Sequence, residues 1–130
     1  MKTLAKAIKD KFTGDFALQG FLTGGLWLHQ APIETPLPYA TFDLIAGSTD
    51  YTNTDVIETY TVEFAIYAED VETVMETYSQ INTTFNLQTL TYDTGAEVSM
   101  RRESMTGPVE LDSTFQVTTD YEVMRSEVLT

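Results

Sequence analysis

The stretch ETYTVEFAIYAEDVETVMETYSQINTTF, Glu58–Phe85, changes its hydrophobic period part-way along. In Glu58–Tyr67 apolar and polar side chains alternate, which predicts a strand with one buried face. That face contains Tyr60, Val62, Phe64 and Ile66. From Val71 to Phe85 the apolar residues recur at steps of three and four, which predicts an amphipathic helix. Asp70 should cap this helix, because its carboxylate can accept hydrogen bonds from the N–H groups of the first turn.

The start of the chain is also predicted to be helical. Residues 3–12 carry an apolar stripe at four-residue spacing, which indicates an amphipathic helix. The stripe consists of Leu4, Ile8 and Phe12. Asp15 can cap a second, short helix that ends at Gly24-Gly25, where a positive φ costs little.

Two extended segments follow these helices. Leu26–His29 is short and precedes a loop with three prolines, so we expect it at an edge of the sheet or crossing it. Tyr39–Ala46 alternates, and its expected inner face consists of Ala40, Phe42, Leu44 and Ala46. This strand should pair antiparallel with Glu58–Tyr67 across the polar stretch Gly47–Val56, which we interpret as a long loop.

The part of the chain after the Val71–Phe85 helix is rich in strand signals. Leu87–Tyr92 is either a strand or the exit from the helix, and Ala96–Met105 alternates as a strand. Gly107-Pro108 should turn the chain before a long last strand, Thr114–Val128. The predicted order is α-α-β-β-β-α-β-β, with two main helices. It indicates one α+β domain over residues 1–130, with a largely antiparallel mixed sheet.

The charge balance is strongly acidic, with 20 acidic and seven basic residues and a net charge of −13. Four of the basic residues lie within the first 11, which leaves 19 acidic and three basic residues from Phe12 onward. This balance argues against a protein that grips nucleic acid by its phosphates. The chain contains no cysteine, which excludes disulfides and thiolate chemistry. A signal-peptide-like start and a membrane-spanning apolar run are both absent from the sequence, so we expect synthesis in the cytoplasm and no membrane partner.

The residues that usually carry catalysis or bind metals are scarce. His29 is the only histidine, and beside Trp27 it is interpreted as a packing or surface residue. Asp50, Asn53, Asp55 and Glu58 could surround a calcium ion, but their spacing does not match the calcium-loop pattern with its central glycine. We therefore predict no enzymatic activity, no catalytic residue, no cofactor and no metal site.

Arg101 and Arg102 stand out because basic residues are rare in this part of the chain. Adjacent residues on a strand point to opposite faces, so they need different partners. Cross-strand pairing with Asp120 or Glu122 is one interpretation, and an ion pair between subunits is the other.

Several segments taken together resemble the tail-completion, or tail-terminator, proteins of long-tailed bacteriophages. The resemblance covers residues 3–127 and lies in the pattern of elements and in a few Gly, Pro and Tyr positions. Its parts are the N-terminal helix, the apolar run ending in Gly24-Gly25, the Ala31-Pro32 and Pro36-Leu37-Pro38-Tyr39 loop, the Glu58–Tyr67 strand leading through Ala68-Glu69-Asp70 into a helix, and the long last strand.

This resemblance implies a structural virion protein at the junction of head and tail. Members of the family cap the tail tube as a six-fold ring, end tail elongation, and meet the tube protein on one side and the head-side connector on the other. The lumen of such a ring passes DNA without binding it specifically.

Physical reasoning adds a set of assembly-interface residues that the resemblance does not supply. Large exposed aromatic side chains and charged side chains anchor interfaces. The set consists of Tyr51, Asn53 and Asp55 in the expected loop, with Arg101 and Arg102 as charge partners.

Two alternatives to a tail terminator remain open at this point. One is a head-closure or minor tail protein of the same assembly. The other is a small non-enzymatic binding module, with a cavity between the sheet and the long helix lined by Tyr60, Phe64 and Tyr78.

Overall fold

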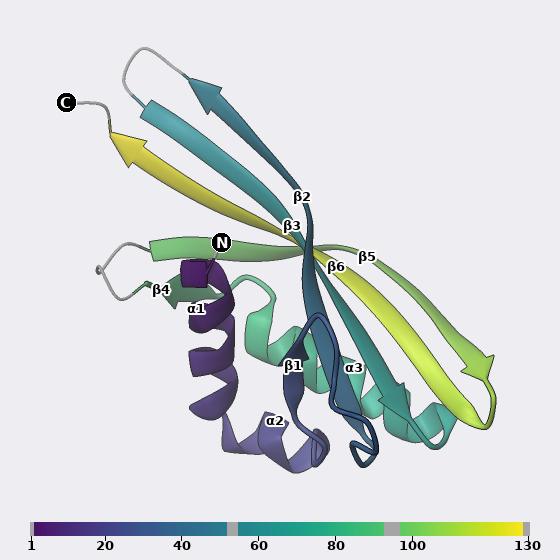
Figure 1. The fold of residues 1–130 in the computed structure, drawn as a ribbon. Helices are drawn as coiled ribbons and strands as arrows, with labels where there is room; N and C mark the ends of the chain where they lie inside the picture. The colour runs from purple at the N-terminus through teal and green to yellow at the C-terminus, as the bar shows by residue number, and fades with distance from the viewer. Residues whose placement is uncertain (1, 52–54, 93–96, 129–130) are drawn as a thin grey trace.

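The computed structural model describes residues 2–51, 55–92 and 97–128. Its elements are α1 (Lys2–Thr13), α2 (Phe16–Phe21), β1 (Leu26–Leu28), β2 (Tyr39–Tyr51), β3 (Asp55–Ala68), α3 (Val71–Phe85), β4 (Thr89–Thr91), β5 (Glu97–Leu111) and β6 (Thr114–Val128). The helices lie on one side of a twisted sheet (Figure 1). Within the described residues, no helix is long and apolar enough to cross a membrane.

The sheet has six strands in the order β1-β2-β3-β6-β5-β4. β1 runs parallel to β2, and the other neighbours pair antiparallel. The predicted α+β class, mixed sheet and order of elements are confirmed. β4 lies inside Leu87–Tyr92, so the segment that the sequence left open is a short strand. The Leu26–Leu28 strand lies at one edge of the sheet, as predicted.

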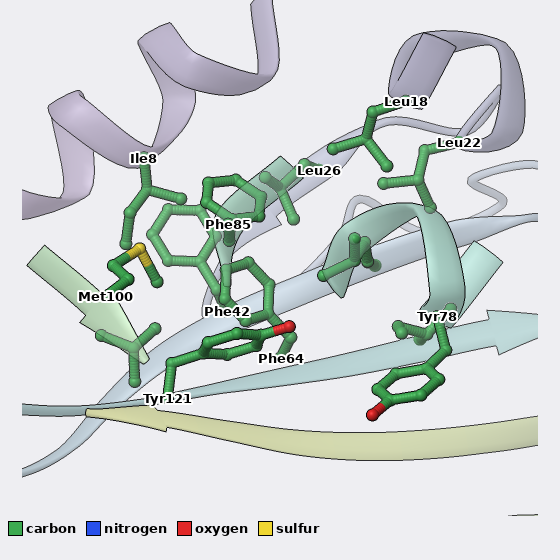
Figure 2. Packing of buried hydrophobic residues seen from close by; sticks show 14 of the residues in the cluster. Ile8, Leu18, Leu22, Leu26, Phe42, Phe64, Tyr78, Phe85, Met100 and Tyr121 are labelled. Atoms are coloured by element: carbon green, nitrogen blue, oxygen red, sulfur yellow. The ribbon is translucent and has the colours of Figure 1, made fainter. Parts of the chain in front are cut away.

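The core is built around the predicted strand and helix. Val62, Phe64 and Ile66 of β3 are all fully buried, so the predicted inner face is confirmed. The ring of Phe64 lies 5.1 Å from that of Phe85 and 5.5 Å from that of Tyr121, with the latter pair edge to face. Figure 2 shows these rings gathered between the sheet and the helices. Edge-to-face and tilted aromatic pairs add stability beyond the area that they bury.

Both predicted helix caps are present. Asp70 directly precedes α3 and accepts a 2.7 Å hydrogen bond from the N–H of Thr73 in the first turn of that helix. Asp15 directly precedes α2 and accepts a 3.0 Å hydrogen bond from the N–H of Leu18 in the first turn of that helix. The second oxygen of Asp15 also accepts from the buried hydroxyl of Thr84 at 2.7 Å, so this cap joins α2 to α3.

The prediction of a long loop over Gly47–Val56 is wrong. β2 continues to Tyr51, and β3 begins at Asp55, with Tyr51 opposite Val56; residues 52–54 lie outside the described residues. The strands extend beyond the core because β3 also pairs with β6 along this length, from Asp55 opposite Val128. Threonine, tyrosine and β-branched residues are enriched in strands, and residues 57–61 of β3 are half-buried. The polar composition indicates exposure, which an exposed strand and a loop have in common.

The prediction that the chain turns at Gly107-Pro108 is also wrong. This pair lies inside β5, at a shift in register between Thr106 and Val109. The chain turns instead at Asp112 and Ser113, both of which have positive φ, at 45° and 70°. Two consecutive positive φ angles suit a tight two-residue hairpin, because they match the twist of the strands.

Candidate assembly surface

A three-stranded arm extends beyond the helices (Figure 1). We define the arm as residues 45–51 of β2, 55–61 of β3 and 122–128 of β6, which pair with one another. Every residue of its β2 part is exposed. The β2 part of the arm is therefore held mainly by backbone pairing, whereas residues 57–61 of β3 are half-buried and Val123 of β6 is buried.

Of the predicted interface residues in the former loop, Tyr51 and Asp55 lie at the end of this arm. Tyr51 is the last residue of β2, and its side chain is 75% exposed. Asp55 begins β3, but its side chain lies outside the described residues. Asn53 lies outside them altogether. An exposed tyrosine at the tip of a projecting arm is well placed to bury area against a partner.

The two arginines point to opposite faces of β5, as expected. Arg101 lies on the face away from the helices and donates to Glu122 at 3.1 Å, which confirms cross-strand pairing for this residue. Arg102 lies on the helix side, where its guanidinium donates to the hydroxyl of Tyr78. The N–H of Arg102 donates to the side chain of Asn86 at 2.8 Å. Arg102 thus joins β5 to α3, while Arg101 remains accessible with 65% of its side chain exposed.

The structure does not bring the arginines near the arm tip within one copy of the chain. Tyr51 is at the free end of β2, opposite Val56. Arg101 is on β5, which is separated from β2 by β3 and β6. The described members of the predicted set are therefore not one continuous patch: Tyr51 lies at the arm tip, and Arg101 and Arg102 form a separate β5 site.

A row of carboxylates crosses the sheet on the face away from the helices, and sequence reasoning missed it. Asp43 lies opposite Glu63 on β3, and Glu63 lies opposite Asp120 on β6. Partial burial, reinforced by the neighbouring Asp120 carboxylate, raises the pKa of Glu63. Oδ1 of Asp120 is buried with no hydrogen-bond partner in the described part of the chain. A protonated Glu63 would offer the missing donor, because a neutral carboxyl carries one O–H.

His29 stands at the end of this row as a surface residue. Its Nδ1 lies 2.8 Å from Oδ1 of Asp43, and its side chain is largely exposed. Among the described residues, no three His, Asp or Glu side chains are grouped so that they could hold a metal ion. The arrangement is an acidic surface in which neighbouring carboxyl groups repel each other.

The binding-module alternative requires space around Phe64 and Tyr78. Phe64 is completely buried, and Tyr78 is 8% exposed and hydrogen bonded to Arg102. The aromatic rings of Phe42, Phe85 and Tyr121 surround Phe64. These side chains fill the region in which a ligand between sheet and helix would lie.

Comparison with known proteins identifies the fold. Neither a protein-family model nor a curated protein sequence matches the chain significantly. Among solved structures, a chain from the virion of a native gene transfer agent particle matches with a TM-score of 0.77. The match covers 97% of this chain and 96% of that one, at 10% sequence identity. The two chains share a fold.

A second solved structure matches less closely. Its TM-score is 0.55 at 11% identity, again over 97% of this chain and 96% of its own. At these identities the likeness shows the fold alone. It extends over nearly the whole of both chains.

Proposed function

We propose that this protein is a structural virion component, a subunit of the ring that caps a phage tail tube and joins it to the head-side connector. The observation that carries this proposal is the end-to-end likeness of the fold to a chain of a gene transfer agent virion. The resemblance of the sequence pattern to tail terminators supports the finer role, because it rests on different information.

The edges of the sheet support a role in assembly. β1 pairs only with Ala40–Phe42 of β2, so within the described residues no strand pairs with the outer side of β2 from Asp43 onward. β4 likewise pairs only with Glu97–Ser99 of β5. Unpaired strand edges recruit other chains unless they are protected. Two long edges and an exposed arm suit a protein that works inside a larger assembly.

The acidic face of the sheet supports passage of DNA without binding. Asp43, Glu63 and Asp120 cross this face, and Glu122 lies beside them. Such a surface repels phosphate groups, and Arg101, the cation on the same face, is paired with Glu122. A lumen lined in this way would allow DNA to slide.

We assign the assembly contacts to the arm tip and to the β5 site. Tyr51 belongs to the first, and Arg101 and Arg102 to the second; Asn53 and Asp55 are proposed as contacts from the sequence alone. Arg101 is the better contact residue of the two arginines, because Arg102 already joins β5 to Tyr78 within the chain. The tail tube protein and the head-side connector are the proposed further partners, at the virion's head–tail junction.

The test is the mass of the protein in solution over a range of concentrations, with negative-stain imaging of the same samples. We expect six-fold rings with an open centre. A compact closed dimer without a pore would overturn the ring proposal. A monomer that gains thermal stability with a small ligand would move the assignment to a binding module.

A further inference from the structure

Two carboxyl groups meet on the two central strands of the sheet, on the face away from the helices. Glu63 of β3 and Asp120 of β6 are direct partners in the antiparallel register. The carboxyl group of Glu63 also lies within hydrogen-bonding reach of that of Asp120. Like charges directly opposite each other on neighbouring strands are destabilising. If both groups were ionised, the two strands would repel each other at this point.

Carboxylates flank Glu63 on both sides, and their charges act on it. Two basic groups border this face, and each has another partner. Arg101 donates to Glu122 at 3.1 Å. Nδ1 of His29 lies 2.8 Å from the flanking carboxylate of Asp43. The titratable groups that face Glu63 are therefore Asp43 and His29 on the β2 side, Asp120 and Glu122 on the β6 side, Arg101 on β5 and Tyr67 along β3.

Asp120 lacks one hydrogen-bond donor. Its Oδ2 accepts from the hydroxyl of Ser104 on β5 at 3.3 Å. Its Oδ1 is buried and has no hydrogen-bond partner in the described part of the chain, so it bears the full cost of lost hydration. An ionised Glu63 has no proton to donate, whereas the neutral form carries one O–H. A single proton between the two groups supplies the missing donor and removes the repulsion.

The burial of Glu63 favours the same state. Partial burial, and after it the charge of Asp120, raises the pKa of Glu63, because removal from water and a neighbouring negative charge both penalise the ionised form. Glu63 therefore keeps its proton at pH values at which exposed glutamates have lost theirs. The position of the two groups and the missing donor are independent of this shift, and one proton accounts for all three.

We propose that Glu63 and Asp120 share one proton, which joins β3 to β6 and makes this junction sensitive to pH. The O–H of Glu63 donates to Oδ1 of Asp120. As the pH rises, loss of the proton replaces a hydrogen bond with repulsion between two carboxylates. The stabilisation is thus present at low pH and is lost as the pH rises through the raised pKa of Glu63. The shared proton belongs to a single chain, so its test does not depend on whether rings form.

The consequence for the molecule is local. The pair lies well inside the ladder between β3 and β6. On the other face of the same strands, Phe64 packs edge to face on Tyr121, with 5.5 Å between the ring centroids. The core therefore holds the two strands together after the proton is lost, while the backbone hydrogen bonds near Glu63 open more often.

Carbon-detected NMR of isotope-labelled protein follows each carboxyl group directly, from about pH 3 to pH 9, which brackets the ordinary carboxyl range. We expect the carboxyl carbon of Glu63 to titrate at higher pH than those of Glu103 and Glu110, which are exposed. The carboxyl carbon of Asp120 should move in the same step, because coupled groups titrate as a pair. Titration of Glu63 together with the exposed glutamates, or no response of Asp120 at the Glu63 midpoint, would overturn the proposal.

Two variants separate a shared proton from simple repulsion along the row. Asp120→Asn and Asp43→Asn each remove one negative charge that flanks Glu63. Only Asp120→Asn also removes the ionised acceptor of the proton, and its amide can donate to an ionised Glu63. We expect a large fall of the Glu63 midpoint in the first variant and a small one in the second. Equal falls would show that charge alone sets the midpoint and that no proton is shared.

Amide hydrogen exchange tests the link between the proton and the strands. After division by the intrinsic base-catalysed rate, exchange at residues 62–65 should become faster as the pH rises through the Glu63 midpoint. Glu63→Gln stays neutral and should remove this dependence, whereas the control Glu103→Gln, at an exposed site on β5, should retain it. Protection of residues 62–65 that does not change with pH in the wild type would contradict a pH-sensitive junction.

Discussion

The helix-covered half of the sheet and the arm are built from the same three strands. In the first half Phe42, Phe64 and Tyr121 are buried beneath the helices. In the arm, Ile45–Tyr51 of β2 is exposed throughout. The ladder of backbone pairs runs through both halves, with one register shift on β2 between Leu44 and Ala46. The comparison teaches that hydrophobic alternation reports burial of one face, while pairing alone can carry a strand beyond the core.

The largest effect should come from the centre of the covered half. Phe64→Ala removes a fully buried ring that packs against three others, and we expect a loss of about 3–5 kcal/mol in the free energy of unfolding. Urea denaturation measures this change. Thr49→Ala, on the exposed part of β2, is the matched control and should change stability by less than about 0.5 kcal/mol. Similar losses for the two variants would remove the distinction between the halves.

The next effect concerns the helical layer that covers only one half. Asp15→Ala removes the cap of α2 and the hydrogen bond to Thr84 of α3, and should cost about 1–2 kcal/mol. The hydrogen bond from the Leu18 N–H lowers the pKa of Asp15, so this contribution is present above the ordinary pKa of an aspartate and fades as the pH falls below it. Chemical denaturation at pH 7 and pH 3 tests both statements. A cost that is unchanged at pH 3 would contradict the role of the carboxylate.

A smaller, pH-dependent effect sharpens the comparison on the acidic face. Burial and Asp120 raise the pKa of Glu63 in the folded protein, so folding favours the protonated form. Stability from this site is present at low pH and is lost as the pH rises from the unfolded pKa through the folded one. Glu63→Gln, which stays neutral and can donate to Asp120, should therefore stabilise the protein at pH 7. The gain over wild type should vanish below about pH 4, near the ordinary pKa of glutamate.

The smallest effect on folding should occur at the arm tip. Tyr51→Ser removes an exposed ring and should change the free energy of unfolding by less than about 0.5 kcal/mol. Its consequence should appear in self-association instead, measured by sedimentation at several concentrations. A clear loss of monomer stability with unchanged association would mean that Tyr51 packs within its own chain.

The predictable parts of the molecule are those in which the signal lies within one segment. The alternation around Phe64 predicted the buried face of β3, and the position of Asp70 and Asp15 before apolar helices predicted both caps. The prediction of a loop over Gly47–Val56 failed because exposure of β2 on both faces removes the alternation that marks a strand. The prediction of a turn at Gly107-Pro108 failed because turn-forming residues also occur at irregularities within edge strands.

The candidate site was only half predictable for a related reason. Tyr51 and Arg101 could be named from size and charge, and both are exposed. The division of the predicted set into an arm tip and a β5 site follows from the sheet order, which periodicity does not specify.

The sequence by itself determined the α+β class, the central strand and helix, the caps and the acidic balance, because each depends on neighbours along the chain. Only the tertiary structure decided the arm and the Asp43–Glu63–Asp120 row. Each of these depends on which residues from distant strands lie opposite one another. That register is set by the packing of whole strands beneath the helices and by their backbone pairing, and no local pattern records it.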